Sequence, residues 1–379
     1  MRLSTHSKLA DINEDAWNAL AGGNPFLSHG FLSTLESTNC LEPQGWYPHH
    51  LLLWDGDVLR AALPLYLRDN SYGEFVFDWA WAEAYEKGGG KYYPKLVTAV
   101  PFSPVGGSRF LIDPSDTKAQ EMASQLLNAV KSICQDNDFS SWHCLFLDEV
   151  QKDFFSDNET LARLGCQYHW FNDNYLTFDN FLSALSSKKR KNIKRERRKV
   201  SESGLQIECL SGDDITEEHW ITFYAFYCST FYQKWGEPRL TLDFFLSLNS
   251  RLPDCAVLIL AKDKEKYVAG AFALSSEDTL YGRHWGCNEN YDSLHFELCY
   301  YQTIEYCIRH KLKTLDAGAQ GEHKISRGFV PVKTWSLHWI RELSFRNPVE
   351  NFLNNETRAI EEYIDKLDDH SAFKKDVTL

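Results

Sequence analysis

The sequence has few features that would place it in a membrane, in an oxidising compartment or around a metal ion. No stretch of its 379 residues approaches the apolar length of a membrane span, and Met1 to His6 lack the apolar core of a secretory signal. The ten cysteines form no C-x-x-C pair and no Cys/His ligand spacing. This pattern is typical of reduced, mostly buried thiols in a cytoplasmic protein, so we expect neither disulfides nor a metal site.

Positive charge is also scarce, except in one segment. The chain carries 40 Lys and Arg against 53 Asp and Glu, and nine of the basic residues fall within Ser186 to Val200. Without that segment the formal charge of the chain is −21. The segment predicts a helix that is capped at Ser186 or Ser187 and ended by Gly204 in a left-handed conformation.

This basic helix has only a narrow apolar side, so most of its charges must face solvent or a partner. A positive strip on an acidic molecule attracts anions such as phosphate, nucleic acid or membrane headgroups. The alternative is a solvated helix surface without a ligand, because blocks of like charge are common on such helices. The candidate anion- or RNA-binding residues are Lys188, Lys189, Arg190, Lys191, Lys194 and Arg195.

The chain is long enough for about two domains, and the order of its predicted elements repeats. The first half reads as a hairpin at 50–66, a strand at 71–79, a helix at 117–137, a strand at 142–147, a short helix at 159–165 and a strand at 166–171. The second half reads as a hairpin at 257–274, a strand at 279–286, a helix at 295–310 and strands at 314–316 and 333–340. Two copies of one mixed α/β unit explain this order. We predict domains at 1–172 and 173–345, and a C-terminal helix within 346–379 that packs back on the body.

Four segments, together with this order, resemble a known family. They are Asp78–Tyr85, Ser187–Ile193, His295–Glu297 and Gly318–Lys324. They resemble the FemAB-like N-acyltransferases of peptidoglycan-related type, and the tandem order resembles the FemABX-like peptidyltransferases of the GNAT superfamily. The resemblance spans roughly residues 24–345. It implies an α+β fold of two tandem GNAT-like acyl-CoA N-acyltransferase units.

The same resemblance implies transfer of an acyl or aminoacyl group to an amine of a peptide-like or amino-sugar substrate in cell-wall metabolism. The donor would be acetyl-CoA, another acyl-CoA or an aminoacyl-tRNA. The usual GNAT enzyme cradles the pyrophosphate of CoA in a glycine-bearing loop at a helix start. Here residues 288–297 contain no glycine, and Asp292 and Glu297 would repel phosphate. This departure favours an aminoacyl-tRNA, for which the basic helix is a candidate partner.

The reaction needs a base that keeps the attacking amine neutral, and N–H groups that hold the carbonyl oxygen. Glu322 and His323 are the candidate catalytic bases, since they follow the second-half strand where this fold keeps its reactive groups. The alternative is that Glu322 pairs with Lys324 or Arg327 across a turn. The candidate substrate-binding residues are Asp78, Tyr281, Arg283, Trp285, His295, Glu297, Gln320, Lys324 and Arg327.

Two of these predictions leave a structural choice open. On the strand at 279–286, either Tyr281, Arg283 and Trp285 or the residues between them line the cleft. Asp78 is expected within an aromatic strand, where it is either hydrogen-bonded or facing a cleft. Three functions remain open as well: an N-acyltransferase, an aminoacyl-tRNA-dependent transferase, and a non-catalytic binding protein on a transferase fold.

Overall fold

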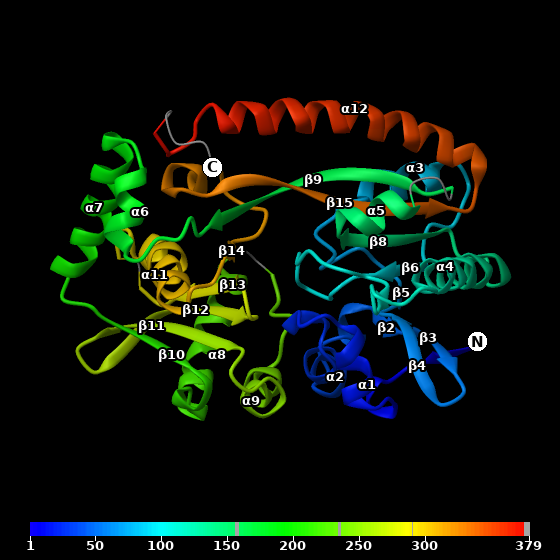
Figure 1. Ribbon diagram of the computed structural model, residues 1–379, viewed down its shortest axis with the longest axis horizontal. Helices are drawn as coiled ribbons and strands as arrows, with labels where there is room; N and C mark the ends of the chain where they lie inside the picture. Colours follow the sequence, from blue (N-terminus) through cyan, green and yellow to red (C-terminus); the bar gives the residue numbers. More distant parts are fainter. Residues whose placement is uncertain (156–158, 234–235, 290, 375–379) are drawn as a thin grey trace. The chain divides into compact units, whose positions relative to one another are not determined.

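The computed structural model describes residues 1–155, 159–233, 236–289 and 291–374, and its chain forms two compact units (Figure 1). Unit 1 comprises Met1–Gly165 and Lys333–Glu362, and unit 2 comprises Cys166–Val332 and Tyr363–Leu379. The chain changes unit within β9 (Leu161–Phe171), β15 (Val330–Ile340) and α12 (Leu343–Asp368). The domain boundaries expected from the sequence stay a prediction; this division differs from them in assigning residues 333–362 to unit 1.

Unit 1 contains two groups of strands. The first is an antiparallel sheet in the order β1-β3-β4-β7, made of β1 (Arg2–His6), β3 (His50–Asp55), β4 (Val58–Leu63) and β7 (Leu111–Ile112). The second follows the order β2-β5-β6-β8 and consists of β2 (Trp46–Pro48), β5 (Tyr66–Arg68), β6 (Lys95–Thr98) and β8 (Ser141–Leu147). Its helices are α1 (Glu14–Leu20), α2 (His29–Ser37), α3 (Trp79–Lys87), α4 (Ala119–Asp136) and α5 (Glu149–Phe155).

In unit 1, β6 and β8 form a parallel pair that is registered at three positions, Leu96–Trp142, Val97–His143 and Thr98–Cys144. The connection between them carries α4, whose apolar side packs into the core of the unit through Met122, Leu126 and Val130. A parallel pair needs such a crossover, because a tight turn joins only antiparallel strands. β8 continues to Leu147, beyond the last registered position.

Two sequence predictions for unit 1 are wrong. Residues 71–78 form no strand, and Asp78 instead occupies the N-cap position of α3. The segment folds as a loop because its acidic side chains bind buried cations, as described below. The predicted helix at 159–165 is also absent, since β9 begins at Leu161 and pairs with its neighbours in the sheet. Tertiary pairing overrides local propensity at such positions.

Unit 2 contains one run of strands in the order β10-β11-β12-β13-β14-β9. The strands are β10 (Gln206–Ser211), β11 (Ala256–Asp263), β12 (Lys266–Ser275), β13 (Thr279–Cys287) and β14 (Thr314–Asp316). The helices are α6 (Phe178–Ala184), α7 (Ser187–Glu202), α8 (Glu217–Tyr232), α9 (Leu242–Arg251), α10 (Leu294–Phe296) and α11 (Gln302–His310). A π-helical turn, η5 (Glu297–Tyr301), joins α10 to α11, and a 3-10 helix, η6 (Glu322–Arg327), follows β14. In Figure 1, α8 lies on one side of β12 and β13 and α11 on the other.

In unit 2, β13 and β14 form the second parallel pair, again registered at three positions: Thr279–Thr314, Leu280–Leu315 and Tyr281–Asp316. β13 runs on to Cys287 past the last registered position. A hairpin, a strand, a helix and a parallel strand therefore recur in both units, although β6 replaces the predicted third strand of unit 1. The α+β fold class is confirmed.

The basic helix is α7, and its C-terminal end is as predicted. Ser186 occupies the N-cap position, although its hydroxyl makes no capping hydrogen bond. Gly204 adopts a left-handed conformation with a φ of 79°. In the part of the chain that the structure describes, no helix is long and apolar enough to cross a bilayer.

Candidate functional site

Polar side chains gather in unit 2 where the β13–β14 pair ends. The register between β12 and β13 shifts next to Phe272, so Arg283 forms a bulge, a feature often found beside active sites. Arg283 Nη2 donates to Asp316 Oδ2 at 2.8 Å, and both side chains are buried. Burial raises the pKa of Asp316, but Arg283 and His169 lower it further, so its carboxyl group has a pKa below the usual range.

Lys324 is buried beside this pair, with 4% of its surface exposed. Its Nζ donates to the carbonyl oxygens of Ala317 at 2.5 Å and Gly318 at 3.2 Å. Burial lowers the pKa of Lys324 to about 8, although the negative charge of Asp316 opposes the shift. A lysine with such a pKa can bind or release a proton near neutral pH.

Glu322 and His323, the two predicted bases, lie at the start of η6 with their side chains at the surface. The Tyr363 hydroxyl donates to Glu322 Oε1 at 2.9 Å, and the Tyr300 hydroxyl lies 2.9 Å from His323 Nε2. Burial, followed by the positive charges of Arg327 and Lys324, lowers the pKa of His323. Glu322 forms no ion pair with Lys324 or Arg327, so that alternative is wrong for these described residues.

The structure resolves which side of β13 is packed. His284 is enclosed by Tyr227 and Phe272, at ring distances of 5.0 and 6.2 Å, and a Cβ at Gly286 would meet the backbone of Phe226. This side therefore lies against α8 and cannot line a cleft.

The opposite side of β13 carries predicted substrate residues. The Arg283 guanidinium lies 5.5 Å from the Tyr281 ring, and the Trp285 ring lies 5.2 Å from that of His295. His295 is in turn 6.3 Å from His323, and burial lowers its pKa to about 4. Another predicted residue, Gln320, is exposed in the loop after β14.

Two further predicted substrate residues, Arg327 and Glu297, hold the basic helix to the body of unit 2. Arg327 Nη2 donates to Glu196 of α7 at 2.9 Å. Glu297 accepts from Arg197 of α7 and from Gln302 at 2.8 Å. Sequence reasoning could not find the two pairs with α7, because their partners are 100 and 131 residues apart in the chain.

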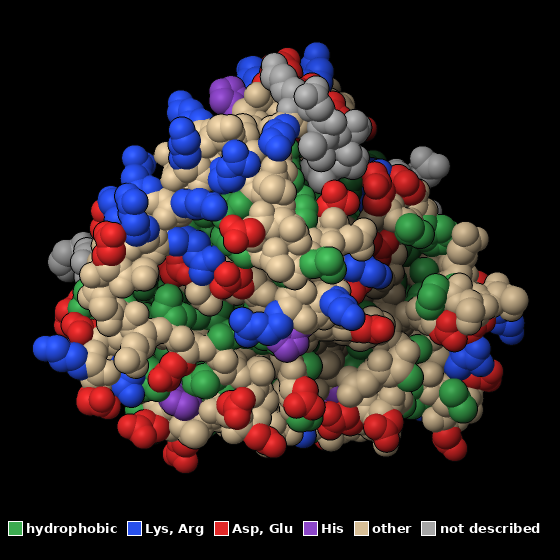
Figure 2. Space-filling model, turned by 60° about the vertical axis from the view of Figure 1, so that its left-hand side comes forward, with side chains coloured by type: hydrophobic (Ala, Val, Ile, Leu, Met, Phe, Trp, Pro, Cys, Tyr) green, Lys and Arg blue, Asp and Glu red, His purple; other side chains and the backbone are tan. Residues whose placement is uncertain are grey.

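Five cations of α7 have no neutralising partner among the described residues. Within the described residues, no carboxylate lies at ion-pair distance from Lys188, Lys189, Arg190, Lys191 or Arg195, and we call these five residues the basic surface. Two other lysines of the helix are paired: Lys194 with Asp179 at 3.5 Å and Lys199 with Asp292 at 2.5 Å. Figure 2 shows Lys and Arg side chains gathered on the face that carries α7.

The pairs made by α7 also correct an electrostatic expectation. Asp292 and Glu297 were predicted to repel phosphate, but Lys199 and Arg197 compensate their charges. The segment that lacks glycine includes Asn290, which lies outside the described residues. Repulsion by these two acids is therefore not an argument against a phosphate-bearing donor.

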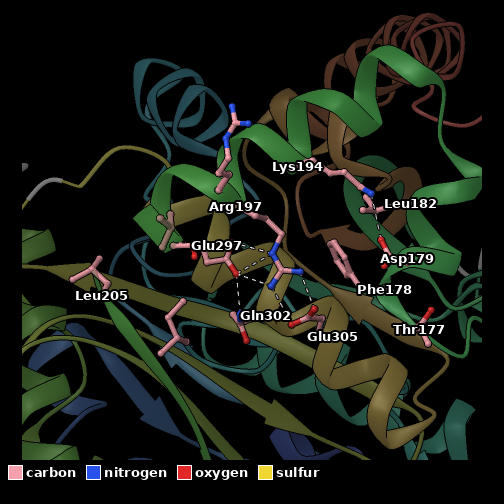
Figure 3. A pocket seen from close by; sticks show the side chains of 14 residues that line it. Thr177, Phe178, Asp179, Leu182, Lys194, Arg197, Leu205, Glu297, Gln302 and Glu305 are labelled. Atoms are coloured by element: carbon pink, nitrogen blue, oxygen red, sulfur yellow. Dashed lines mark hydrogen bonds and ion pairs between the residues drawn. The ribbon is translucent and has the colours of Figure 1, made fainter. Parts of the chain in front are cut away.

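Beneath α7 lies an open hollow of about 760 Å³ (Figure 3). Its walls come from α6, α7, β10, η5 and α11. Arg197 points into it and binds Glu297 and Glu305, at 3.0 and 2.8 Å, while its guanidinium lies 4.5 Å from the Phe178 ring. Since this arginine is already saturated by two carboxylates, the hollow offers no free cation at its centre.

In unit 1, the side chain of Arg109 fills the space at the end of the parallel pair. Arg109 is fully buried, and its Nε donates to the carbonyl oxygen of Leu145, the residue after the last registered position of β8. Its remaining N–H groups donate to the carbonyl oxygens of Val105, Gly107 and Ser108. Burial lowers the pKa of Arg109 to about 10, so the group remains charged at neutral pH.

Asp78 belongs to a buried ionic cluster of unit 1, which sequence reasoning missed. Lys95 Nζ donates to Asp78 at 2.5 Å, to Glu74 at 2.8 Å and to Ser71 at 2.8 Å. Arg68 adds a bond to Glu74 at 3.2 Å, and all of these side chains are buried. We call Arg68, Glu74, Asp78 and Lys95 the ionic cluster. No group of three His, Cys, Asp or Glu in the described ranges is arranged to hold a metal ion.

Each unit contains a hairpin, a strand, a helix and a parallel strand in the same order, and solved structures share this two-unit fold. FemX is 13% identical, with 92% of this chain and 100% of that chain covered and a TM-score of 0.57. A conserved protein of unknown function from Bacteroides thetaiotaomicron is 10% identical, with 90% and 100% covered and a TM-score of 0.55. The L-PGS of Bacillus licheniformis is 11% identical, with 85% and 94% covered and a TM-score of 0.50.

The chain belongs to the FemAB-like family. The sequence model of this family, described as peptidoglycan biosynthesis/recognition, matches residues 8–375. No curated protein matches the chain. The structural neighbours are so distant in sequence that their likeness shows the fold alone.

Proposed function

We propose that this protein transfers an acyl or aminoacyl group to an amine of a peptide-like or amino-sugar substrate in cell-wall metabolism. The reaction would take place in unit 2, at the end of the β13–β14 pair. One observation carries the proposal: a buried lysine with a pKa of about 8 stands there beside an ionised Arg283–Asp316 pair. Family membership supports the reaction class.

In this proposal, Lys324 is the base that accepts a proton from the attacking amine. The bond that forms joins the amine nitrogen to the acyl carbon of the donor, and the bond that breaks joins this carbon to the leaving oxygen or sulfur. The proton lost by the amine passes to Lys324 and then to the leaving group. Glu322 and His323 remain alternative bases, but both side chains lie at the surface, and the lowered pKa of His323 reduces its basicity.

The test is transfer activity, followed by mass spectrometry of amine acceptors with acetyl-CoA and, separately, with an aminoacyl-tRNA. Lys324→Met should reduce the rate by about 10²- to 10⁴-fold, the usual contribution of a general base. Lys324→Arg keeps the positive charge but cannot accept a proton, so it should be as inactive. Lys266→Met, at an exposed lysine of the same unit, is the control. Full activity of Lys324→Arg would assign the base to Glu322 or His323, which Glu322→Gln and His323→Ala would then separate.

A second candidate function, transfer from an aminoacyl-tRNA in particular, is favoured by the basic surface. Five unpaired cations on one helix fit a phosphate backbone. Added salt weakens such binding, because the release of counterions from the nucleic acid becomes less favourable. The combined change of Lys188, Lys189, Arg190 and Lys191 to Ala should weaken tRNA binding and flatten its dependence on salt. Lys199→Ala, which removes a lysine already paired with Asp292, is the matched control. Equal affinity and an equal salt slope in the fourfold variant would exclude this donor.

A further inference from the structure

In the loop between β5 and α3, acidic side chains are buried and aromatic side chains are exposed, the opposite of the usual arrangement. Glu74 and Asp78 are buried, with 3% and 2% of their surfaces exposed. Tyr72, Phe77 and Trp79 are exposed by 60%, 56% and 48%. Acidic residues are almost never buried unless paired, and clustered exposed aromatic side chains mark interaction sites.

The ionic cluster holds this loop in place. Each buried acid is bound by Lys95, and Arg68 Nη2 also donates to the backbone oxygen of Tyr72 at 2.8 Å. On the other side of the loop, Arg163 donates to the backbone oxygen of Phe77 at 2.8 Å. Phe75 has a φ of 63°, a left-handed conformation that is strained for an aromatic residue. The rings are thus fixed outward by contacts beneath them.

The exposed rings form one continuous surface, which we call the aromatic platform: Tyr72, Phe77 and Trp79. The Phe77 and Trp79 rings are 4.9 Å apart and inclined by 33°, and the Tyr72 and Trp79 rings are 5.9 Å apart and inclined by 53°. Asp69 is exposed at the edge of the loop, and its carboxylate accepts a bond from Asn70, whose Oδ1 in turn accepts from the backbone N–H of Tyr72. Aromatic faces with hydrogen-bonding groups at their edge suit a flat ligand with an apolar side and polar substituents.

The charge around the platform restricts the ligand. Two arginines lie beside the platform: Arg68 is buried, and Arg163 is paired with Glu356 and has 14% of its side chain exposed. Asp69, in contrast, is exposed. A nucleic acid or an anionic membrane would require exposed Lys or Arg beside the rings. The platform therefore disfavours an anionic ligand and fits one whose hydroxyls or amides donate hydrogen bonds to Asp69.

We propose that the aromatic platform binds the sugar rings of an uncharged glycan, whose C–H faces stack on Phe77 and Trp79 while its hydroxyls donate hydrogen bonds to the exposed carboxylate of Asp69. The family description, which names peptidoglycan, agrees with a glycan ligand. This site lies in unit 1 and is separate from the site proposed for transfer in unit 2. Binding at the platform needs no transfer chemistry, so the two proposals fail independently.

The test is calorimetric titration of the full chain with tetra-N-acetylchitotetraose, with tryptophan fluorescence as a second measure. We expect saturable binding that is insensitive to salt and quenches or shifts tryptophan emission. Trp79→Ala and Phe77→Ala should each weaken binding about tenfold or more, in keeping with the energies of single aromatic stacking contacts. Tyr232→Ala, which removes a 64% exposed aromatic side chain of unit 2, should leave binding unchanged.

Circular dichroism spectra of the variants would verify that they remain folded, which is expected because the changed rings are exposed. Lys324→Met should bind the glycan normally, so inactivity in transfer together with intact binding separates the two proposals. No binding of the oligosaccharide by the unaltered protein, or binding that survives both platform changes, would overturn the inference. Platform-dependent binding to vesicles of anionic phospholipid or to RNA, in place of the glycan, would also overturn it.

Discussion

Each unit buries a lysine, and the two lysines differ in what surrounds them. In unit 1, Lys95 donates all three of its N–H groups, two of them to carboxylates. Burial lowers the pKa of Lys95, but Asp78 and Glu74 raise it further, so the net shift is upward. In unit 2, Lys324 donates to two carbonyl oxygens, and burial lowers its pKa to about 8.

Two copies of one architecture can therefore give a buried lysine two different roles. Lys95 is locked in its charged form and shapes a loop, as a structural ion pair does. Lys324 is close to its titration point, as expected of a group that exchanges protons. The openings beside the parallel pairs differ in the same way, because Arg109 fills that of unit 1 with a permanent charge. These contrasts support placing the reaction in unit 2.

The largest effect on stability is expected from breaking the ionic cluster. Lys95→Met would leave Glu74 and Asp78 buried without their shared cation, which typically costs about 3–5 kcal/mol of unfolding free energy. Urea denaturation would measure the loss. The control, Lys87→Met, removes an exposed lysine that pairs with Glu83 and should cost less than about 1 kcal/mol. Similar small losses in both variants would show that the cluster does not hold unit 1 together.

A smaller effect distinguishes the two buried cations, Arg109 and Lys324, that lie beside the parallel pairs. Arg109→Met would leave buried carbonyl groups without a donor, at about 1–3 kcal/mol for each group that water cannot reach. Lys324→Met removes fewer hydrogen bonds and also relieves the cost of burying a charge, so it should lose less stability. Comparing the two denaturation midpoints tests this order. If Lys324→Met were the less stable protein, Lys324 would be the more important structural residue.

The most modest effect concerns pH and follows from the lowered pKa of Lys324. If Lys324 is the base, kcat/KM should rise about tenfold per pH unit below pH 8 and level off above it. Its pKa in the unfolded chain is near the ordinary 10.5, so between pH 8 and 10.5 the unfolded state binds more protons. Stability of the unaltered protein relative to Lys324→Met should therefore increase over this range, by at most about 1.4 kcal/mol per pH unit. A flat rate profile and a constant stability difference would contradict the assignment.

Much of the architecture was predictable because it depends on local patterns. The helical spacing of apolar residues in α4, the basic run in α7 and the Asp-Gly turn of the first hairpin all lie within short segments. The third strand of unit 1 was misplaced because residues 71–79 alternate like a strand. Their acidic side chains turn inward only because Lys95 and Arg68 lie beneath them, and the local pattern does not contain that information.

The location of the candidate site could be predicted from the sequence, but the partners and roles of its residues could not. Its location after β14 follows from element order, and Arg283 and Lys324 were named as ligand-binding residues. The roles of Glu297 and Arg327 were not visible, since Arg197 and Glu196 reach them from a helix about a hundred residues or more earlier. Asp316 was not predicted as a site residue, because a single acid at the end of a three-residue strand is not a distinctive pattern.

The sequence by itself determined the tandem repeat, the fold class and the isolated positive charge of α7, because hydrophobic periodicity and net charge are properties of the chain. Only the tertiary structure decided which side of β13 is packed, which cations are neutralised and which lysine has a pKa near neutrality. Burial and the distance between charges set these properties, and both depend on residues that folding brings together from distant parts of the sequence.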